Sequence, residues 1–226
     1  MNVTARQISL FPFIHNATSV YDHPTLDHNC YQTHTAFVNR EISPSPLLAS
    51  TRHRPQREFG GKPPAPADGK KFICLDKIFN FTPGKCLIFS FGVNNEWSFE
   101  DEMEKFGCKV YAFDPTMGKE DHQRSPNIKF YATGIAHYKG TKRIGMGNNW
   151  SEKKVDRFEN LVRQAGEEGR EIDYVKLDVE LSEIDFLQDM LFNSPHVLAK
   201  IKQIGMEVHD GPFRDGISET ISVLNA

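Results

Sequence analysis

The sequence is poor in cysteine, in long apolar runs and in excess charge of either sign. Four Cys in 226 residues are too few for a disulfide-dense scaffold. The 27 Lys and Arg nearly balance 30 Asp and Glu, and a net charge of −3 argues against a generic nucleic-acid binder. No stretch approaches the ~18 consecutive apolar residues of a membrane-spanning helix. We therefore expect no nucleic-acid partner and no membrane span in this chain.

The first 70 residues differ in composition from the rest of the chain. They contain eight of the 13 Pro but only five of the 30 acidic residues. Proline removes backbone donors and restricts the residue before it, and so few apolar side chains cannot offset the entropy of ordering. We therefore expect residues 1–70 to be a largely disordered, proline-rich segment and residues 71–226 to form the folded domain.

From residue 71 onward, short apolar runs alternate with segments of helical periodicity. The first helical segment begins at Ser98, a candidate N-cap, and ends at Gly107. Strands that alternate with helices predict right-handed βαβ units. The predicted fold is therefore α/β, a Rossmann-like three-layer sandwich with a mainly parallel sheet. Its expected strands are 86–92, 109–115, 128–134, 172–178 and 201–209, and its expected helices are 98–107, 151–165 and 182–191.

The loop after the first expected strand has features of a ligand-binding turn. Gly92 allows close approach of the backbone, and the following helix start offers free N–H groups. Asp114 ends the second expected strand 22 residues beyond Gly92, where an acid can accept hydrogen bonds from ribose hydroxyls. The plainer alternative is that both residues only build turns. Taken together they favour an adenosine-containing ligand, and the lack of a G-x-G-x-x-G motif disfavours a nicotinamide dinucleotide.

Acidic groups and a histidine follow the last two expected strands. Asp178 and Glu180 end one strand, while Glu207 and His209 end the next. His209 has a side chain whose ordinary pKa suits a general base, although a histidine on an edge strand is an equal alternative. Asp178 could instead orient a backbone loop. A metal ion held by Asp178, Glu180 and His209 is the less favoured alternative, and we expect none.

Four stretches together resemble a known family: 90–100 (SFGVNNEWSFE), 112–115 (AFDP), 174–180 (YVKLDVE) and 205–209 (GMEVH). They are similar to class I S-adenosylmethionine-dependent methyltransferases, in particular to the animal methyltransferase-like protein 24 group, which is related to FkbM-type O-methyltransferases. The resemblance covers about residues 72–224. It implies an enzyme that transfers a methyl group from S-adenosylmethionine to a hydroxyl of a small molecule or saccharide. The alternative is a catalytically inactive binding module with the same fold.

The resemblance also implies roles for individual residues. Methyl transfer needs in-line placement of the acceptor and removal of its proton, and the sequence does not choose the base among Asp178, Glu180 and His209. Ser90 stands where most class I enzymes have an acid. The expected cofactor-binding residues are Ser90, Gly92, Val93 and Asn94 at the methionine end, Asp114 at the ribose, and Gly134 and Ile135 beside the adenine.

The end of the chain departs from the family pattern. Class I sheets usually have two further strands after the fifth, but only 17 residues follow His209. We therefore expect either a C-terminally truncated methyltransferase domain or a fifth strand with an exposed edge. The strip 142–150 is expected to be an exposed loop, although its Trp150 could stack on an acceptor.

The cysteines and the glycosylation sequons leave the compartment open. Cys74, Cys86 and Cys108 lie in or beside apolar stretches and are expected to be buried thiols. The sequons begin at Asn2, Asn16, Asn80 and Asn149. The family suggests the secretory pathway, as a Golgi or secreted protein, whereas absence of a targeting segment would suggest the cytoplasm. No oligomeric state is predicted.

Overall fold

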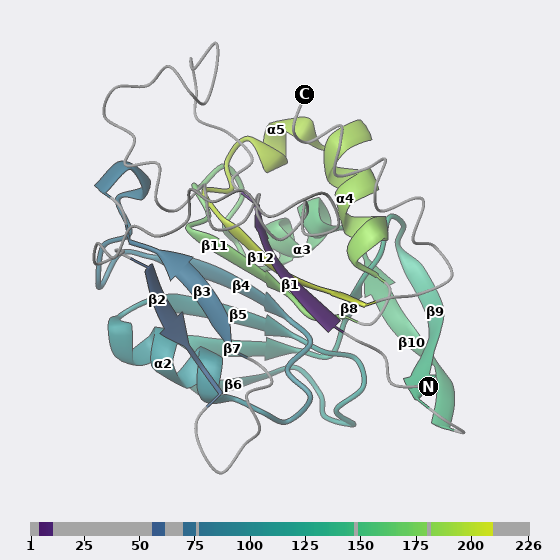
Figure 1. The fold of residues 1–226 in the computed structure, drawn as a ribbon. Coiled ribbons are helices and arrows are strands. Elements are labelled where there is room, and N and C mark those ends of the chain that lie inside the picture. The colour runs from purple at the N-terminus through teal and green to yellow at the C-terminus, as the bar shows by residue number, and fades with distance from the viewer. Residues whose placement is uncertain are drawn as a thin grey trace, which may run out of the picture.

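The structure is a computed structural model that describes residues 5–10, 56–61, 70–75, 77–146, 149–179 and 182–209. Its centre is a seven-stranded sheet with the order β1-β12-β11-β4-β5-β7-β6 (Figure 1). The five inner strands are parallel to one another, whereas the two edge strands, β1 and β6, are antiparallel to their neighbours. The strands are β1 (Ala5–Leu10), β4 (Leu87–Phe91), β5 (Lys109–Phe113), β6 (His122–Ser125), β7 (Ile128–Tyr131), β11 (Tyr174–Leu177) and β12 (Ile204–His209). The predicted α/β fold with a mainly parallel sheet is confirmed.

Side chains of the inner strands alternate between two apolar cores. In β4, Leu87, Phe89 and Phe91 face the core that also contains side chains of three helices. Ile88 faces the other core, which contains side chains of one helix and of a two-stranded sheet. One outer layer therefore consists of α3 (Phe158–Gln164), α4 (Glu183–Phe192) and α5 (Pro195–Leu198), and the other of α2 (Ser98–Phe106), β2 (Gln56–Phe59) and β3 (Lys71–Cys74), with the 3-10 helix η1 (Lys77–Phe79) after β3.

The last parallel strand, β12, does not form an exposed edge, so that alternative was wrong, and a truncated domain stays a prediction. β1 pairs with it antiparallel along its whole length, from Ala5 opposite His209 to Leu10 opposite Ile204 (Figure 1). Such pairing uses backbone groups and leaves little trace in a six-residue sequence. Both β1 and β2 lie before residue 71, so residues 5–10 and 56–61 belong to the folded domain. The rest of the segment 1–70, and residues 210–226, lie outside the described residues.

The predicted helix 151–165 was wrong in its first half. Residues 149–156 form β10 (Asn149–Asp156), which pairs antiparallel with β9 (Gly140–Met146), and the helix begins only at Phe158. Val155 fits a helical spacing with Phe158, but it lies in the strand opposite Gly140, and it also pairs with Gly134 of β8 (Gly134–Ile135). The strip 142–150 was expected to be a loop, but its described residues, 142–146 and 149–150, belong to the two strands of a hairpin, which extends beyond the carboxyl ends of the inner strands (Figure 1).

The first predicted helix is confirmed, with one change at its start. Trp97 is the N-cap residue and Ser98 is already helical, so Ser98 does not cap the helix. Gly107 ends the helix with a φ of 99°, and its N–H donates to the carbonyl of Glu104. This left-handed conformation is the reason for glycine at that position.

The three cysteines that the structure describes are buried as expected, but they are not thiols. Cys86 and Cys108, which directly precede β4 and β5, form a disulfide, and Cys74 is disulfide-bonded as well. Sequence spacing alone does not reveal this pairing, because the two residues become neighbours only when β4 and β5 lie side by side.

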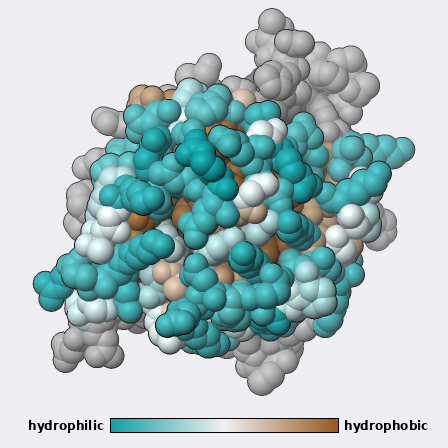
Figure 2. All heavy atoms as spheres, turned by 180° about the vertical axis from the view of Figure 1, so that it is seen from behind, coloured by the Kyte–Doolittle hydropathy of each residue, from teal (hydrophilic) through white to brown (hydrophobic). Residues whose placement is uncertain are grey.

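The described surface is mostly polar. On the face shown in Figure 2, hydrophilic residues predominate and hydrophobic ones appear only in small areas between them. The exposed large hydrophobic residues include Phe72, Tyr138, Trp150 and Phe192, which come from different elements. Within the described ranges, no helix is both long enough and apolar enough to span a bilayer.

Candidate functional site

The order of the strands predicts a binding crevice at the carboxyl ends of β4 and β11. From β4 the chain adds β5 and β7 on one side, and then crosses to add β11 and β12 on the other. Ligands of open α/β sheets bind where the strand order reverses in this way. The expected site residues Gly92, Asp114 and Asp178 directly follow β4, β5 and β11. The topology therefore brings them to the same edge of the sheet.

The loop after β4 needs glycine at position 92 because it meets the end of β11. Gly92 has a φ of 79°, and a Cβ added there would lie 1.7 Å from the carbonyl oxygen of Asp178. Asn94 and Asn95 also have positive φ, of 47° and 58°, which asparagine tolerates better than most residues. The close approach inferred from the sequence is thus present, but it is made to protein backbone.

Asp114 holds this loop through both of its carboxylate oxygens. Oδ2 accepts hydrogen bonds from the N–H groups of Val93 (3.0 Å) and Asn94 (2.8 Å). Oδ1 accepts two more, from the N–H (2.8 Å) and hydroxyl (2.5 Å) of Thr116. A carboxylate has about four lone-pair positions, so these four bonds use its ordinary capacity. Asp114 is also only 4% exposed. Its first role is therefore to position the loop, and a contact with ribose stays a prediction.

A buried charged pair, Lys176 and Glu100, contacts the loop after β4 through the carbonyl of Gly92. The Lys176 ammonium donates to the carbonyl of Gly92 at 2.7 Å and lies 3.8 Å from Glu100 Oε1. The same oxygen accepts a hydrogen bond from the Ser90 hydroxyl at 2.5 Å. Ser90 is fully buried, so its hydroxyl serves this contact. Glu100 of α2 thus places a buried carboxylate beside the Ser90 hydroxyl.

A second cation, Lys71, joins the ends of β11 and β12. Its ammonium lies 3.3 Å from Asp178 Oδ2 and 3.0 Å from Glu207 Oε2, and the Lys71 side chain is 1% exposed. We call these three residues the Lys71 triad. Among the described residues, Asp178 Oδ1 has no partner, and the Asp178 side chain is 20% exposed. Asp178 therefore has one oxygen fixed by a cation and another available.

Sequence reasoning missed Lys71, Glu100 and Lys176. Lys71 was placed at a domain boundary, and the contact between Glu100 and Lys176 joins residues that lie far apart in the sequence. The only sequence signal is that Lys176 and Glu100 fall within the stretches that carry the family resemblance. For Lys71 and Lys176, a charged residue within an apolar strand is the feature that could have identified them.

Two other expected catalytic groups cannot be placed. Glu180 lies outside the described residues. The backbone of His209 ends β12 opposite Ala5, but its side chain is not described. Their roles stay predictions. In the part of the chain that the structure describes, no three His, Cys, Asp or Glu side chains form a group that could hold a metal ion.

Gly134 and Ile135 border the Asp114 turn but are buried in this structure. They form β8, which pairs with the end of β10. A Cβ at Gly134 would come within 3.0 Å of Pro115 Cγ, so glycine permits close packing of the two loops. Nothing here tests their expected contact with adenine.

The β9–β10 hairpin is fastened to the start of α4. The Lys142 ammonium donates to Ser182 Oγ at 3.0 Å and to Asp185 Oδ2 at 2.8 Å. β8 follows the carboxyl end of β7, and α4 follows that of β11. The hairpin contacts both, so it lies beside the carboxyl ends of the inner strands. Trp150 lies on β10 of this hairpin, and 49% of its surface is exposed.

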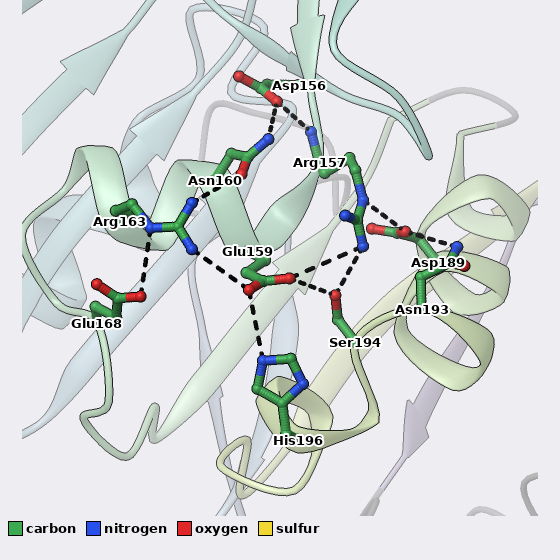
Figure 3. Close-up of polar contacts among 10 residues, drawn as sticks. All are labelled: Asp156, Arg157, Glu159, Asn160, Arg163, Glu168, Asp189, Asn193, Ser194 and His196. Atoms are coloured by element: carbon green, nitrogen blue, oxygen red, sulfur yellow. Dashed lines mark hydrogen bonds and ion pairs between the residues drawn. The ribbon is translucent and has the colours of Figure 1, made fainter.

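A separate polar network ties the helices of one outer layer together (Figure 3). Arg157 donates to Asp189 at 2.9 Å and to Ser194 at 2.8 Å, and the Ser194 hydroxyl donates to Glu159 at 2.7 Å. That hydrogen bond lowers the pKa of the Glu159 carboxyl, against the opposing effect of burial. The neighbouring open cavity of about 430 Å³ is lined by Lys139, Lys154, Asp156, Asn160, Arg163 and Gln164. The contacts join α3 to α4 and α5, so their role is structural.

The sheet order defines an α/β protein with polar groups gathered at its switch point. Comparison with known proteins makes the class specific: a family model described as "Methyltransferase domain" matches residues 55–223. The chain therefore belongs to this methyltransferase-domain family, within the class I methyltransferases.

One curated relative agrees with this assignment. The human protein named "Probable methyltransferase-like protein 24" is 24% identical over 142 residues, which are 61% of this chain and 37% of that protein. The chain thus aligns with little more than a third of the length of the relative it matches. No solved structure matches the chain significantly.

Proposed function

We propose that this methyltransferase uses S-adenosylmethionine to methylate a hydroxyl group of a small molecule or saccharide. The observation that carries the proposal is the meeting of the glycine loop, Asp114 and Asp178 at the switch point of a methyltransferase-family sheet. Family membership supports a methyl donor, and the acid at the end of β5 favours an adenosine-containing one.

The residues at the crevice fit such a donor in chemistry and placement. The amides of Asn94 and Asn95 lie on the loop with exposed side chains, and amides can both donate and accept hydrogen bonds. Asp178 offers a carboxylate oxygen without a described partner. When bound, the donor supplies an electrophilic methyl group on a sulfonium. Asn94 and Asn95 would hold its polar groups, while Asp114 fixes the backbone that presents them.

Asp178 is the described residue best suited to receive the proton of the acceptor hydroxyl. Lys71 fixes Oδ2 and balances the carboxylate charge, and it leaves Oδ1 to accept a hydrogen bond from the acceptor. As the acceptor oxygen forms its bond to the methyl carbon, its proton would pass to Asp178. Lys71 is then a positioning residue, since it acts through Asp178. Glu180 and His209 stay alternative bases.

One observation favours the alternative of a binding module without turnover. All four ordinary acceptor positions of Asp114 are already used by the loop and Thr116, so the loop is complete without a ligand. Under this alternative the fold binds the donor or its product weakly, and no methyl group is transferred.

Thermal shift separates these functions. At about 100 times its Kd, a ligand stabilises a protein by about 2.7 kcal/mol. We expect S-adenosylmethionine and S-adenosylhomocysteine to raise the melting temperature, and NAD to leave it unchanged. Absence of a shift with both adenosyl ligands, on folded protein, would refute the proposed donor. Stabilisation without turnover would favour the binding module.

Transfer of a labelled methyl group tests the chemistry. With a panel of hydroxyl compounds and saccharides, we expect a product that resists alkali, as an ether does and an ester does not. Asp178→Asn should lower the rate by about 100-fold or more while donor binding is retained. Lys71→Met should lower the maximal rate, and Lys71→Arg should restore part of it. Glu171→Gln, at an exposed position beside Lys202, is the matched control. An unchanged rate in Asp178→Asn would remove Asp178 as the base.

A further inference from the structure

The oxidised cysteines indicate the kind of compartment in which this chain folds. Each of the three cysteines that the structure describes is disulfide-bonded, and Cys86 and Cys108 are bonded to each other. Disulfides persist in secreted proteins and in the endoplasmic reticulum, and they are rare where glutathione keeps thiols reduced. Cys86 and Cys108 are also buried, at 2% and 0% exposure, so this disulfide is part of the core. An oxidising compartment is therefore the one that suits the fold.

An asparagine of the same region has the sequence and exposure of a glycosylation site. Asn80, Phe81 and Thr82 form an Asn-x-Thr sequon in the loop between η1 and β4. Asn80 is exposed, and the Thr82 hydroxyl lies 3.1 Å from Asn80 Oδ1. Phe81 packs against Phe106, with ring centroids 5.4 Å apart, and so anchors the loop. The sequon is thus presented on a fixed, solvent-accessible loop.

The position of Asn80 also leaves the crevice open. Asn80 precedes β4, as Cys86 does, and therefore lies toward the amino ends of the inner strands. The crevice lies at their carboxyl ends. A bulky group on Asn80 would extend into solvent at the amino ends of the strands, away from the carboxyl ends. The sequon at Asn149 lies instead on the hairpin at the carboxyl edge, and its side chain is not described.

We propose that this chain folds in the secretory pathway and that Asn80 carries an N-linked glycan. The co-reactant is a lipid-linked oligosaccharide pyrophosphate. Asn80 Nδ2 forms a bond to the anomeric carbon of the sugar, the bond to the pyrophosphate oxygen breaks, and the amide nitrogen releases one proton. The glycan adds a large polar group beside the loop. This inference is independent of the methyl donor and acceptor.

Glycan mapping in animal cells tests the site. The chain is expressed behind a cleavable targeting sequence, with Asn2, Asn16 and Asn149 replaced by Gln. We expect a form heavier by one glycan, which an N-glycosidase removes and which Asn80→Gln and Thr82→Ala abolish. Thr82→Ser is the matched control and should keep the glycan.

Pro83 restricts the backbone of Thr82, so we expect only part of the chains to carry the glycan, and Pro83→Ala should raise that fraction. If the chain is folded and secreted but the heavier form is absent, both with Pro83 and with Pro83→Ala, Asn80 is not a glycosylation site.

Thiol trapping tests the compartment. The chain is expressed in animal cells both in the cytosol and behind a cleavable targeting sequence, and each product is denatured in a thiol-blocking reagent. We expect Cys86 and Cys108 to be protected in the targeted product, and the cytosolic product to be reduced and less heat-stable. A reduced cytosolic product that is as heat-stable as the oxidised one would overturn the compartment. We expect reduction instead to lower the melting temperature by about 5 °C or more.

Discussion

Different kinds of contact stabilise the two ends of the inner strands of the central sheet. We call the side formed by their amino ends the amino edge, and the side formed by their carboxyl ends the carboxyl edge. At the amino edge, the Cys86–Cys108 disulfide joins the starts of β4 and β5 covalently. Nearby, the Glu167 carboxylate accepts hydrogen bonds from Lys109 at 2.8 Å and from Tyr111 at 2.7 Å. These contacts fix the amino edge in one arrangement.

The carboxyl edge depends instead on charged groups that are withdrawn from water. Lys71 and Lys176 are 1% and 2% exposed, and each contacts both a carboxylate and the end of an inner strand. Burial of charge costs free energy that only good partners recover. The comparison indicates that a covalent bond fixes the amino edge, whereas buried ion pairs fix the carboxyl edge, where the candidate site lies.

The largest effect should come from breaking the charged pair under the glycine loop. Lys176→Met leaves the fully buried Glu100 without its cation, and loss of one partner of a buried pair costs about 3–5 kcal/mol. Chemical denaturation measures the free energy of unfolding. The double variant Lys176→Met/Glu100→Gln removes both charges and should recover much of the loss. A single variant as stable as the parent would show that the pair does not support the loop.

Removal of the disulfide at the amino edge should lower the free energy of unfolding by a smaller amount. Replacing both Cys86 and Cys108 by Ala removes a link across 22 residues of sequence separation, worth about 2–4 kcal/mol. Because the disulfide lies away from the crevice, affinity for S-adenosylhomocysteine should be unchanged at a temperature where the variant is folded. Calorimetric titration checks this, and a large fall in affinity would contradict the separation of the two edges.

The parts of the fold that sequence could predict are those with a strong local pattern. The inner strands are short apolar runs, and Gly107 ends α2 as predicted, because left-handed backbone requires a residue like glycine. β1 escaped prediction because it pairs with β12, which lies far away in the sequence, and residue spacing does not show such a pairing. In β10, Val155 fits both the helical and the strand period, and only pairing with β9 decides between them.

For the site, sequence located the strand ends but not the groups that support them. Gly92, Asp114 and Asp178 lie where their positions after strands predicted. The roles of Lys71 and Glu100 depend on contacts between distant segments, which residue spacing does not show. Asp114 illustrates the limit further: an acid at that position was expected to bind ligand, yet its carboxylate is occupied by the loop that it positions.

A ligand should sharpen the difference between the edges. With saturating S-adenosylhomocysteine, amide hydrogen exchange in residues 92–97 should slow by about tenfold or more, equivalent to about 1.4 kcal/mol. Exchange at residues 107–110, beside the disulfide, should not change beyond any global stabilisation. Mass-spectrometric exchange on peptides from both segments makes the measurement. Equal slowing at both edges would indicate that the ligand stabilises the domain as a whole rather than the crevice.

The smallest expected effect is on the pH dependence of stability at the amino edge. Burial alone would raise the pKa of the Glu167 carboxyl, but the hydrogen bonds from Lys109 and Tyr111 outweigh it and hold this pKa below the usual 4.5. A carboxyl with a lowered pKa in the folded state adds stability above its unfolded pKa, and that stability is lost as pH falls through the folded pKa. Unfolding free energy should therefore decline below pH 4.5, and Glu167→Gln should make this decline shallower. Glu168→Gln, at the adjacent exposed acid that contacts Arg163, is the matched control and should leave the slope unchanged. Identical slopes for Glu167→Gln and the parent would show that this carboxyl contributes nothing to the rigidity of the amino edge.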